Sequence, residues 1–549
     1  MANLSKIKRE KMLAFLEKLK VQNNDDENIR AITEIENALN EKKYGLVWEE
    51  HSEKVDEMLE HNIPIFVEEE ERKVTANENE AYNFLLEGDN LHSLKLLEKT
   101  HKGKIDVIYI DPPYNTGNKD FIYDDSFVDK TDGYAHSKWL SFMEKRLIIT
   151  RELLSNEGVI FISIDDNEQA QLKLLCDSVF GEDNFIGQLH WKRKKQPSYL
   201  HGNIASVMEY ISVYGKNRNF SPKLSIETTS DSTTRVDNAS NQESERLIKA
   251  GIRAKLDSSI KFIKKGIYKN KTMSTEFLDD VQISEGRTLN KFRAIARYRD
   301  SQERIDLFCN EDALFITKNF GFRRDKLKLE QEKKKAITDL LLDWGDNQDA
   351  EKEFKKVVST NKFSYPKPVK LLCNIFKSFG NKNVTILDFF AGSGTTGHAV
   401  MQLNKEDGGH RKYILCTNNE NNICEEVTYQ RLKNIQEELP HNLKYYKTDF
   451  IPKFSKMEES VSDKMMEHII ELIELEYAIE LDSKKYIILD DEDKLDETIS
   501  KIENGGKLFV RSGIFLSRSN QRILEEKGIS IIEIPEYYFR EELKEVGEL

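Results

Sequence analysis

The sequence predicts an α/β fold in which a mostly parallel sheet is covered by helices on both faces. Three observations predict it. Short apolar runs alternate with helical stretches from Ala81 to about Val179, the same alternation returns from Pro368 to about Leu439, and an irregular basic stretch separates the two regions. Parallel strands need helical crossovers and are apolar throughout because both faces are buried. We therefore expect the two regions to be portions of one sheet.

The first 75 residues are expected to be helical and strongly charged. Apolar residues recur at roughly helical spacing from Leu4 to Leu19, and further periodic stretches run over about 29–39 and 53–59. Such amphipathic helices need a partner face, and we expect their own core to provide it.

Residues 76–216 form the first α/β portion. Strands are expected at Tyr82–Glu87, Ile105–Ile110 and 159–164, and helices at 90–97, about 138–154 and about 169–179. A loop of about 25 residues follows Asp111, which is long for a compact α/β unit and typical of a functional segment.

The second portion spans residues 356–440, and a smaller acidic α/β or α+β domain is expected at 441–549. In the second portion we expect a helix ending at Phe379, a strand at 384–390, a helix at about 395–403, a strand at 413–417 and a helix to about Leu439. Beyond it, strands at Tyr486–Leu489, Lys507–Val510 and 529–534 alternate with helices.

Length and composition limit the class of protein. The chain has 549 residues, 38% hydrophobic and 33% charged, with 26 Gly and 10 Pro. At about 150 residues per domain, this length predicts three or four domains. The low Gly and Pro content excludes collagen-like and wholly disordered chains.

Apolar runs and cysteines exclude further classes. No apolar run approaches the roughly 18 residues of a membrane helix, and the first residues are too charged for a secretory signal. The five cysteines, Cys176, Cys309, Cys373, Cys416 and Cys424, are scattered and form no CxxC pair. A disulfide framework or a zinc site is therefore not expected. We expect a cytoplasmic protein without a metal ion and without membrane association.

The net charge of −14 hides an asymmetry. Residues 191–340 hold 31 Lys and Arg against 20 Asp and Glu, a local +11, whereas the rest of the chain carries 52 against 77, or −25. A basic block inside an acidic protein is typical of a polyanion-binding module, although chance clustering on solvated faces is the alternative.

The first chemical motif is Asp111-Pro112-Pro113-Tyr114, at the carboxyl end of an apolar strand. Open parallel sheets bind ligands at that end. Successive prolines fix φ and lack N–H donors, so the carbonyls of Asp111 and Pro112 are expected to point outward unpaired. With the Asp111 carboxylate they suit an NH₂ group, and Tyr114 offers a flat face to a planar ring. The alternative is an ordinary turn, which Asp-Pro and Pro-Pro also favour.

The second motif runs from Leu387 to Gly397 and leaves a strand to enter a helix. Gly392, Gly394 and Gly397 allow a cofactor to approach the backbone closely, and they also satisfy the dinucleotide pattern G-x-G-x-x-G. Glu420, at the end of the next strand, suits a ribose in either case. No Gly-Lys-Thr follows at the spacing of a Walker phosphate loop. A dinucleotide site and a tight strand–helix turn stay open as alternatives.

Together the two motifs resemble the DNA amino-methyltransferases, which use S-adenosylmethionine. The motif order, catalytic first and cofactor about 275 residues later, resembles their permuted β class. Further segments resemble specifically the modification (Mod) subunit of Type III restriction–modification systems: residues 88–91 (GDNL), 115–121 (NTGNKDF), 139–140 (WL), 158–167 (GVIFISIDDN) and 363–369 (FSYPKPV). The resemblance covers residues 40–435.

This resemblance implies a Rossmann-like methyltransferase sheet, circularly permuted and interrupted by a target-recognition domain. The implied domains are a helical N-terminal extension (1–75), a catalytic portion (76–216), a DNA-binding insert (217–355), a cofactor-binding portion (356–440) and a small C-terminal α/β domain (441–549).

The resemblance also implies roles for single residues. Asp111, Pro112, Pro113 and Tyr114 are the catalytic segment. Phe390 is expected to pack on the adenine of the cofactor, Gly392 and Gly394 to line its sugar–methionine portion, and Glu420 to bind the ribose. The other implied cofactor residues are Asp89, Lys367, Asp388, Ser393 and Thr395. Asp89 also suits a helix N-cap, and Lys367 a solvated charge.

The implied reaction is methyl transfer to an exocyclic amine of a flipped-out base. The Asp111 carboxylate and the Pro112 carbonyl accept the two N–H bonds, so the nitrogen lone pair faces the sulfonium methyl and transfer proceeds in line. Tyr114 stacks on the extruded ring. Adenine N6 is expected, because members of the family that methylate cytosine N4 more often have Ser at the position of Asp111.

Double-stranded DNA is the expected partner, with a homodimer of this chain and a separate helicase–nuclease restriction subunit implied by the resemblance. The candidate DNA-binding residues are Lys192, Arg193, Lys194, Lys195, Arg293, Arg297, Arg299, Arg323 and Arg324. Three alternatives stay open: a cytosine-N4 methyltransferase, a nucleotide-dependent oxidoreductase and a DNA-binding specificity subunit without catalysis.

Overall fold

A computed structural model of the chain describes residues 4–22, 26–40, 48, 51–117, 121–123, 126–129, 131–197, 203–228, 233–269, 273–327, 334–360, 362–453, 460–511, 513–534, 538–545 and 547. The chain divides into two compact units. The larger unit comprises Met1–Pro222, Thr338–Phe376 and Asn381–Leu549, and the insert unit comprises Lys223–Ile337 with Lys377–Gly380.

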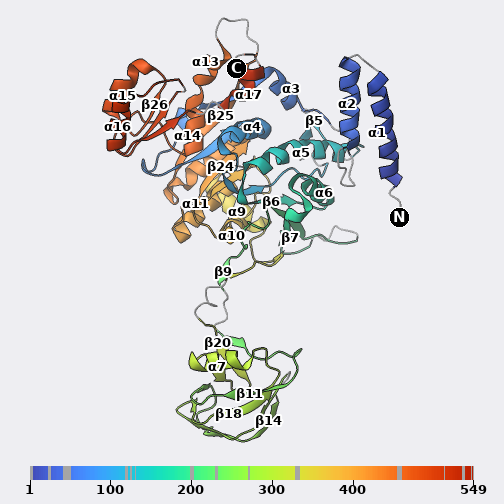
Figure 1. The fold of residues 1–549 in the computed structure, drawn as a ribbon, viewed down its shortest axis with the longest axis vertical. Coiled ribbons are helices and arrows are strands. Elements are labelled where there is room, and N and C mark those ends of the chain that lie inside the picture. Colours follow the sequence, from blue (N-terminus) through green and yellow to red (C-terminus); the bar gives the residue numbers. More distant parts are fainter. Residues whose placement is uncertain are drawn as a thin grey trace. The chain divides into compact units, whose positions relative to one another are not determined.

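A ten-stranded sheet forms the centre of the larger unit (Figure 1). Its strands, in spatial order, are β1 (Asn62–Glu68), β25 (Asn442–Pro452), β2 (Tyr82–Glu87), β24 (Lys412–Thr417), β23 (Thr385–Asp388), β3 (Ile105–Ile110), β6 (Leu154–Ile164), β8 (Met208–Gly215), β7 (Phe185–Lys192) and β22 (Leu340–Leu341). The six strands from β25 to β6 run parallel. The pairs β1–β25, β6–β8 and β8–β7 are antiparallel, and β22 pairs parallel with β7.

The centre of this sheet joins segments from both sides of the insert. β3 pairs with β23, with Val107 opposite Ile386 and Ile108 opposite Leu387. The prediction that the two α/β regions form one sheet is therefore confirmed.

Helices cover both faces of the sheet. Ile108 and Ile110 of β3 share a core with α4 (Asn90–His101), α5 (Ala135–Leu153) and α6 (Gln169–Phe180), and these three helices contact one another in succession. On the opposite face, the ring of Tyr109 packs 6.5 Å from that of Phe376 in α10 (Val369–Phe379). The other helices of this portion are α9 (Asn347–Val357), α11 (Thr395–Asp407) and α12 (Tyr429–Asn434).

The N-terminal region departs from the expected helical extension. Helices α1 (Leu4–Gln22), α2 (Asp26–Asn40) and α3 (Lys54–His61) confirm the helical pattern, but the expectation is wrong at Asn62–Glu68, which forms β1 at the sheet edge. β1 pairs with β25, whose residues lie beyond the predicted boundary at 440. Both strands were missed because each pairs with a segment almost 400 residues away, which no local pattern indicates.

The C-terminal region contributes to the main core and then forms its own small sheet. Helices α13 (Val461–Met466) and α14 (Ile469–Tyr477) pack into the core of the large sheet. The parallel strands β26 (Tyr486–Leu489), β27 (Lys507–Val510) and β28 (Ser530–Glu533) follow, with α15 (Leu495–Lys501) and α16 (Arg518–Glu526) beside them, and α17 (Arg540–Glu545) comes last (Figure 1).

The insert unit is mainly β-structure. A seven-stranded sheet has the order β10 (Thr233–Arg235), β20 (Phe322–Asp325), β19 (Leu314–Ile316), β12 (Arg253–Ala254), β17 (Arg287–Thr288), β16 (Val281–Ser284) and β13 (Phe262–Ile263). A four-stranded sheet has the order β11 (Ser244–Ile248), β18 (Phe292–Ala296), β15 (Ser274–Phe277) and β14 (Gly266–Lys269), and α7 (Gln302–Asn310) joins the core. Two short ribbons complete the chain, β9 (Glu227–Thr228) with β21 (Lys334–Lys335) and, in the larger unit, β4 (Ile122–Tyr123) with β5 (Ser126–Phe127).

The described residues include neither a membrane-spanning helix nor a metal-binding cluster. None of their helices has the length and apolar character needed to cross a bilayer. Nor do three or more of their His, Cys, Asp or Glu side chains gather as they would around a metal ion.

Candidate active site

The candidate site lies at the edge of the large sheet where its parallel strands end. β3 ends directly before Asp111, and the neighbouring β23 ends at Asp388. Asp89 follows β2, and Glu420 follows β24. Since adjacent parallel strands share one carboxyl edge, four neighbouring strands bring four carboxyl groups to the same side of the sheet.

The Asp111 carboxylate is held by two donors. Its Oδ1 accepts hydrogen bonds of 2.8 Å from the Tyr114 hydroxyl and of 2.8 Å from Lys367 Nζ. The indole N–H of Trp139 donates to the Pro113 carbonyl at 2.7 Å, which fixes the two-proline turn to α5. The Pro112 carbonyl accepts no hydrogen bond from the described residues. The segment is therefore a braced turn in which the carbonyl of the buried Pro112 has no hydrogen-bond donor among the described residues.

Tyr114 lies with its hydroxyl toward Asp111. Burial and the negative charge of Asp111 raise the pKa of Tyr114 well above its usual value, so the hydroxyl stays protonated and acts as a donor. Tyr114 is half-buried: its ring packs against the main hydrophobic core, and Lys367 Nζ lies 5.1 Å from the ring centre.

Lys367 joins the Asp111 segment rather than standing as a solvated charge. Its Nζ lies 2.8 Å from the Tyr114 hydroxyl and 3.4 Å from Oε2 of Glu209 in β8. Although burial alone would lower the pKa of Lys367, the carboxylates of Asp111 and Glu209 raise it, so the side chain is cationic. Glu209 was missed by the sequence analysis because nothing in its local pattern marks it.

The glycine loop has the backbone geometry that only glycine adopts easily. Gly392 has φ of 49° and Gly394 has φ of 73°. A Cβ atom added to Gly392 would stand 3.1 Å from the ring of Phe363, and one added to Gly394 would stand 3.1 Å from Thr428. The loop is therefore packed closely against both neighbours, and a side chain at either glycine would crowd it.

Several predicted cofactor residues lie beneath this loop. Asp388 is buried, and it accepts hydrogen bonds from the Phe390 backbone N–H at 3.0 Å and the Thr396 hydroxyl at 2.5 Å. Burial raises the pKa of Asp388 to about 7. Ser393 and Thr395 are also buried, and both accept hydrogen bonds from the guanidinium of Arg431, a residue that the sequence analysis missed. These side chains shape the loop from below, while Phe390 and Gly392 remain partly exposed.

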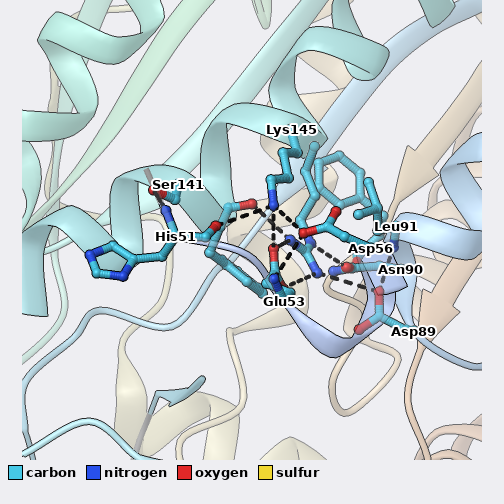
Figure 2. Close-up of polar contacts among 11 residues, drawn as sticks. His51, Glu53, Asp56, Asp89, Asn90, Leu91, Ser141 and Lys145 are labelled. Carbon is cyan, nitrogen blue, oxygen red and sulfur yellow. Dashed lines mark hydrogen bonds and ion pairs between the residues drawn. The ribbon is translucent and has the colours of Figure 1, made fainter. Parts of the chain in front are cut away.

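Asp89 caps α4, as its position before a helix suggested. Its Oδ1 accepts from the Leu91 backbone N–H at 2.7 Å and lies 3.3 Å from Arg146 Nη2. The next residue, Asn90, donates to the Phe389 carbonyl at 2.9 Å, so the start of α4 is tied to the glycine loop. Figure 2 shows Asp89, Asn90 and Leu91 within a larger polar cluster that includes Glu53.

Glu420 is exposed, and its carboxyl group is close enough to Asp89 to be affected by the negative charge of that residue. Partial burial of its carboxyl and the negative charge of Asp89 raise the pKa of Glu420. Two acceptor groups that repel each other suit a ligand with hydroxyl donors, because such donors would relieve the repulsion.

The segment that follows Asp111 contacts another carboxylate, Glu168, which is buried. Asn115 has a left-handed φ of 57°, and its side chain donates to Glu168 Oε1 at 2.6 Å. His136 Nδ1 lies 2.6 Å from the same oxygen. Residues 118–120 of this predicted motif lie outside the described residues.

The predicted DNA-binding residues of the larger unit are partly engaged by acids. Arg193 lies 3.3 Å from Glu209, and Lys195 lies 3.0 Å from Asp349. Lys192 and Lys194 line a surface cavity with Lys195.

In the insert unit, exposure alternates along β18 and the residues after it. Arg293, Arg297 and Arg299 are exposed, whereas Arg324 is buried with its guanidinium 4.2 Å from the centre of the Phe308 ring. Arg323 is half-buried and donates to the Thr233 carbonyl at 3.3 Å. Arg324 therefore belongs to the core of the insert unit, which corrects its expected place among surface DNA contacts.

Comparison with known proteins decides the family. A family model described as DNA methylase matches residues 105–429. The chain belongs to this DNA methylase family. The match contains both motifs and the strands that carry them, and membership leaves the oxidoreductase alternative without support.

Relatives of this DNA methylase include subunits of restriction–modification systems. The Mod subunit of the Type III enzyme StyLTI from Salmonella typhimurium is 33% identical over 406 residues, 69% of this chain and 59% of its own. The Type II methyltransferase M.KpnI from Klebsiella pneumoniae is 32% identical over 392 residues, 66% of this chain and 90% of its own. The solved PvuII DNA methyltransferase (cytosine-N4-specific) aligns over 66% of this chain and 96% of its own, with 11% identity and a TM-score of 0.34. The chain thus spans 59% of the length of the Salmonella relative.

Proposed function

We propose that this chain is a site-specific DNA adenine-N6 methyltransferase that uses S-adenosylmethionine, and that it serves as the modification and specificity subunit of a Type III restriction–modification system. The observation that carries the proposal is the pairing of β3 with β23. Because the two strands are parallel neighbours, the Asp111 segment and the glycine loop open at one edge of the sheet. An amine acceptor and a cofactor cradle therefore stand side by side.

The residues at the loop fit S-adenosylmethionine. The left-handed Gly392 lets the ligand approach the backbone, the partly exposed ring of Phe390 suits an adenine face, and Glu420 suits the ribose hydroxyls. When bound, the cofactor supplies an electrophilic methyl group. Asp388, Ser393 and Thr395 contribute by holding the loop from beneath.

The Asp111 segment orients the amine. The free carboxylate oxygen of Asp111 and the unpaired Pro112 carbonyl accept its two N–H bonds, which directs the nitrogen lone pair toward the glycine loop. The same acceptors stabilise the positive charge that develops on nitrogen. Orientation of both reactants at one edge contributes up to about 7–11 kcal/mol to the lowering of the barrier.

The target base must leave the duplex, because its amine is inaccessible within the stack. The half-buried Tyr114 ring is the proposed stacking surface for the extruded base. Adenine is proposed over cytosine because Asp111 stands where cytosine-N4 enzymes of this family more often have Ser.

DNA binding is assigned to the basic face of the insert unit. Lys291, Arg293, Arg297 and Arg299 are exposed at alternating positions along β18 and its continuation. Alternation places them on one face, where they form a stripe suited to phosphate contacts. Arg293 donates to Asp279 at 3.0 Å and Arg297 lies 3.7 Å from Glu243, so DNA phosphates would compete with these carboxylates. By analogy with the Mod relatives, we also propose the permuted domain order, a homodimer and a separate helicase–nuclease partner.

The test is expression in a host without DNA methylation, followed by mapping of modified bases across the genome. We expect N6-methyladenine in one short, asymmetric sequence. Asp111→Asn should remove the modification while leaving the Kd for S-adenosylmethionine within about threefold, because it changes the amine acceptor and not the cradle. Glu497→Gln, at an exposed carboxylate of α15 paired with Lys501, is the matched control and should modify DNA normally.

Three other outcomes would overturn parts of the proposal. N4-methylcytosine in place of N6-methyladenine would make the enzyme a cytosine methyltransferase. DNA binding without any new modified base would leave a specificity subunit without catalysis. Equal loss of transfer and of cofactor binding in Asp111→Asn would remove the assigned role of that residue.

A further inference from the structure

Glu209 is a buried carboxylate beside the Asp111 segment. It lies in β8, and 7% of its side chain is exposed. Its Oε2 is 3.4 Å from Lys367 Nζ and 3.3 Å from the Tyr114 hydroxyl, and its Oε1 is 3.3 Å from Arg193 Nη1. A buried carboxylate without partners would be strongly unfavourable, so these contacts are needed to keep Glu209 at this position.

Lys367 connects Glu209 to Asp111. Only 10% of its side chain is exposed, and its three N–H donors face Asp111 Oδ1, the Tyr114 hydroxyl and Glu209 Oε2. One ammonium group therefore bridges two carboxylates, and the rings of Tyr114 and Trp191 flank it at 5.1 and 5.6 Å. Such a buried network with every donor used is rigid.

The bridge leaves the two oxygens of Asp111 unequal. Oδ1 accepts from both Lys367 and Tyr114, whereas Oδ2 accepts no hydrogen bond from any described residue. With Oδ1 fixed on the inner side, rotation of the carboxylate about its Cβ–Cγ bond is restricted. The free Oδ2 is then held in one direction, as a precise acceptor requires.

We propose that Glu209 and Lys367 are positioning residues that orient the Asp111 carboxylate for the target amine, an inference that rests on the proposed methyltransferase function. Glu209 acts through Lys367, and neither residue needs to touch the substrate. Glu209 holds the Lys367 ammonium between the two carboxylates. The ammonium therefore fixes Asp111 through Oδ1 and leaves Oδ2 free to accept a hydrogen bond.

The two halves of the bridge have opposite charge, which makes their variants distinguishable. Glu209→Gln leaves Lys367 opposite Asp111 alone, so the ionised form of Asp111 is favoured and the ammonium binds it more closely. Lys367→Met leaves two carboxylates without their shared cation, so ionisation of Asp111 is disfavoured. The charged and titratable groups that face this pair are Tyr109, Tyr114, Arg193 and Asp388.

The experiment is single-turnover methyl transfer to an oligonucleotide duplex carrying the mapped site, with the full-length chain, over a range of pH. We expect Glu209→Gln to lower the transfer rate 10- to 100-fold, with the Kd values for DNA and S-adenosylmethionine within about threefold. The acid limb of the rate profile should move to lower pH in Glu209→Gln and to higher pH in Lys367→Met. Glu209→Asp and Lys367→Arg, which keep the charges, should recover part of the rate.

Glu474→Gln is the matched control. Glu474 is another buried carboxylate with a lysine and a tyrosine partner, 2.6 Å from Lys444 Nζ and 2.7 Å from the Tyr446 hydroxyl, outside the site. It should lower the melting temperature without changing the transfer rate or the pH profile.

The outcomes separate this inference from the function on which it rests. If the unmodified chain transfers no methyl group, the proposed function fails. If it does transfer and Asp111→Asn is inactive, but Glu209→Gln keeps the original rate and pH profile, only the positioning role fails. Movement of both acid limbs in the same direction, or an equal effect from Glu474→Gln, would also overturn it.

Discussion

Arg146 and Glu53 form a bidentate ion pair in the interior of the larger unit. The guanidinium nitrogens donate at 3.0 and 3.1 Å to the two carboxylate oxygens, and no part of the arginine side chain reaches solvent. Figure 2 shows Glu53, Asp89 and Asn90 converging in this cluster, with Lys145 and Asp56 at its margin. The contact joins the segment before α3 to α5 and, through Asn90, to the glycine loop.

Removal of one partner from this pair should destabilise the larger unit. Arg146→Met removes the bidentate partner of the buried Glu53 and leaves it Lys145, 3.9 Å away, which is expected to cost about 3–5 kcal/mol of unfolding free energy. Urea denaturation measures the loss, and Arg146→Met with Glu53→Gln should recover part of it. Lys355→Met, which breaks an exposed pair with Glu351, should cost less than about 1 kcal/mol. A stability for Arg146→Met equal to that of the control would contradict the assignment.

The glycine loop predicts a difference between two alanine substitutions of similar strain. Gly392 and Gly408 have φ of 49° and 65°, so alanine at either position should cost about 1–2 kcal/mol of stability. A Cβ at Gly392 also meets Phe363, whereas one at Gly408 meets nothing within 4 Å. Calorimetric titration should therefore show at least a tenfold weaker Kd for S-adenosylmethionine in Gly392→Ala and an unchanged Kd in Gly408→Ala. Equal losses would mean that the cradle is elsewhere.

Asp388 predicts a pH dependence of stability. Burial raises its pKa from an ordinary 3.8 to about 7, so the folded chain retains a proton that the unfolded chain releases. This contribution to stability is fully present below about pH 4 and is lost as pH rises through 7. The Asp388→Asn variant is neutral at every pH. Its free energy of unfolding, relative to that of the unmodified chain, should therefore rise by up to about 4 kcal/mol between pH 4 and pH 8. Melting curves at several pH values test this, and parallel curves would contradict it.

The basic stripe predicts a salt-dependent affinity for DNA. Arg297→Gln should weaken binding of any duplex and reduce the slope of log Kd against log salt by about one, because one phosphate contact is lost. Arg522→Gln, an exposed arginine of α16 paired with Glu526, is the control and should leave the slope unchanged. Arg324→Met should lower the stability of the insert unit through lost packing on Phe308. An unchanged slope in Arg297→Gln would remove that residue from the interface.

The sequence predicted strands β2 and β3 well and strands β1 and β25 poorly. Tyr82–Glu87 and Ile105–Ile110 were predicted with the bounds that the structure has, because apolar runs ended by Gly or Asp are strong local signals. β1 and β25 were missed, since each pairs with a segment almost 400 residues away, and the unbroken apolar run 63–67 of β1 does not by itself distinguish a strand from a helix.

The same limit applies to the candidate site. The two motifs were evident because each concentrates unusual residues within a few positions. Glu209, Arg431 and Arg146 carry no such local signal, and their positions follow only from tertiary contacts. Lys367 was a candidate because it lies in the motif 363–369, but its contact with Asp111 could not be predicted, since it depends on the folded sheet.

The pairing of β3 with β23 also imposes a delay during synthesis, because the two strands are far apart in the sequence. At about 5–20 residues per second, synthesis leaves roughly 15–55 s between the emergence of Ile110 and that of Thr385. Once β6 has also emerged, β3 can pair with it on one side, but its other edge stays unpaired until β23 is made. An unpaired apolar edge binds other strands readily, so the ribosome-bound chain should depend on chaperones during this wait. The arrangement that creates the site thus makes the half-made protein prone to aggregation.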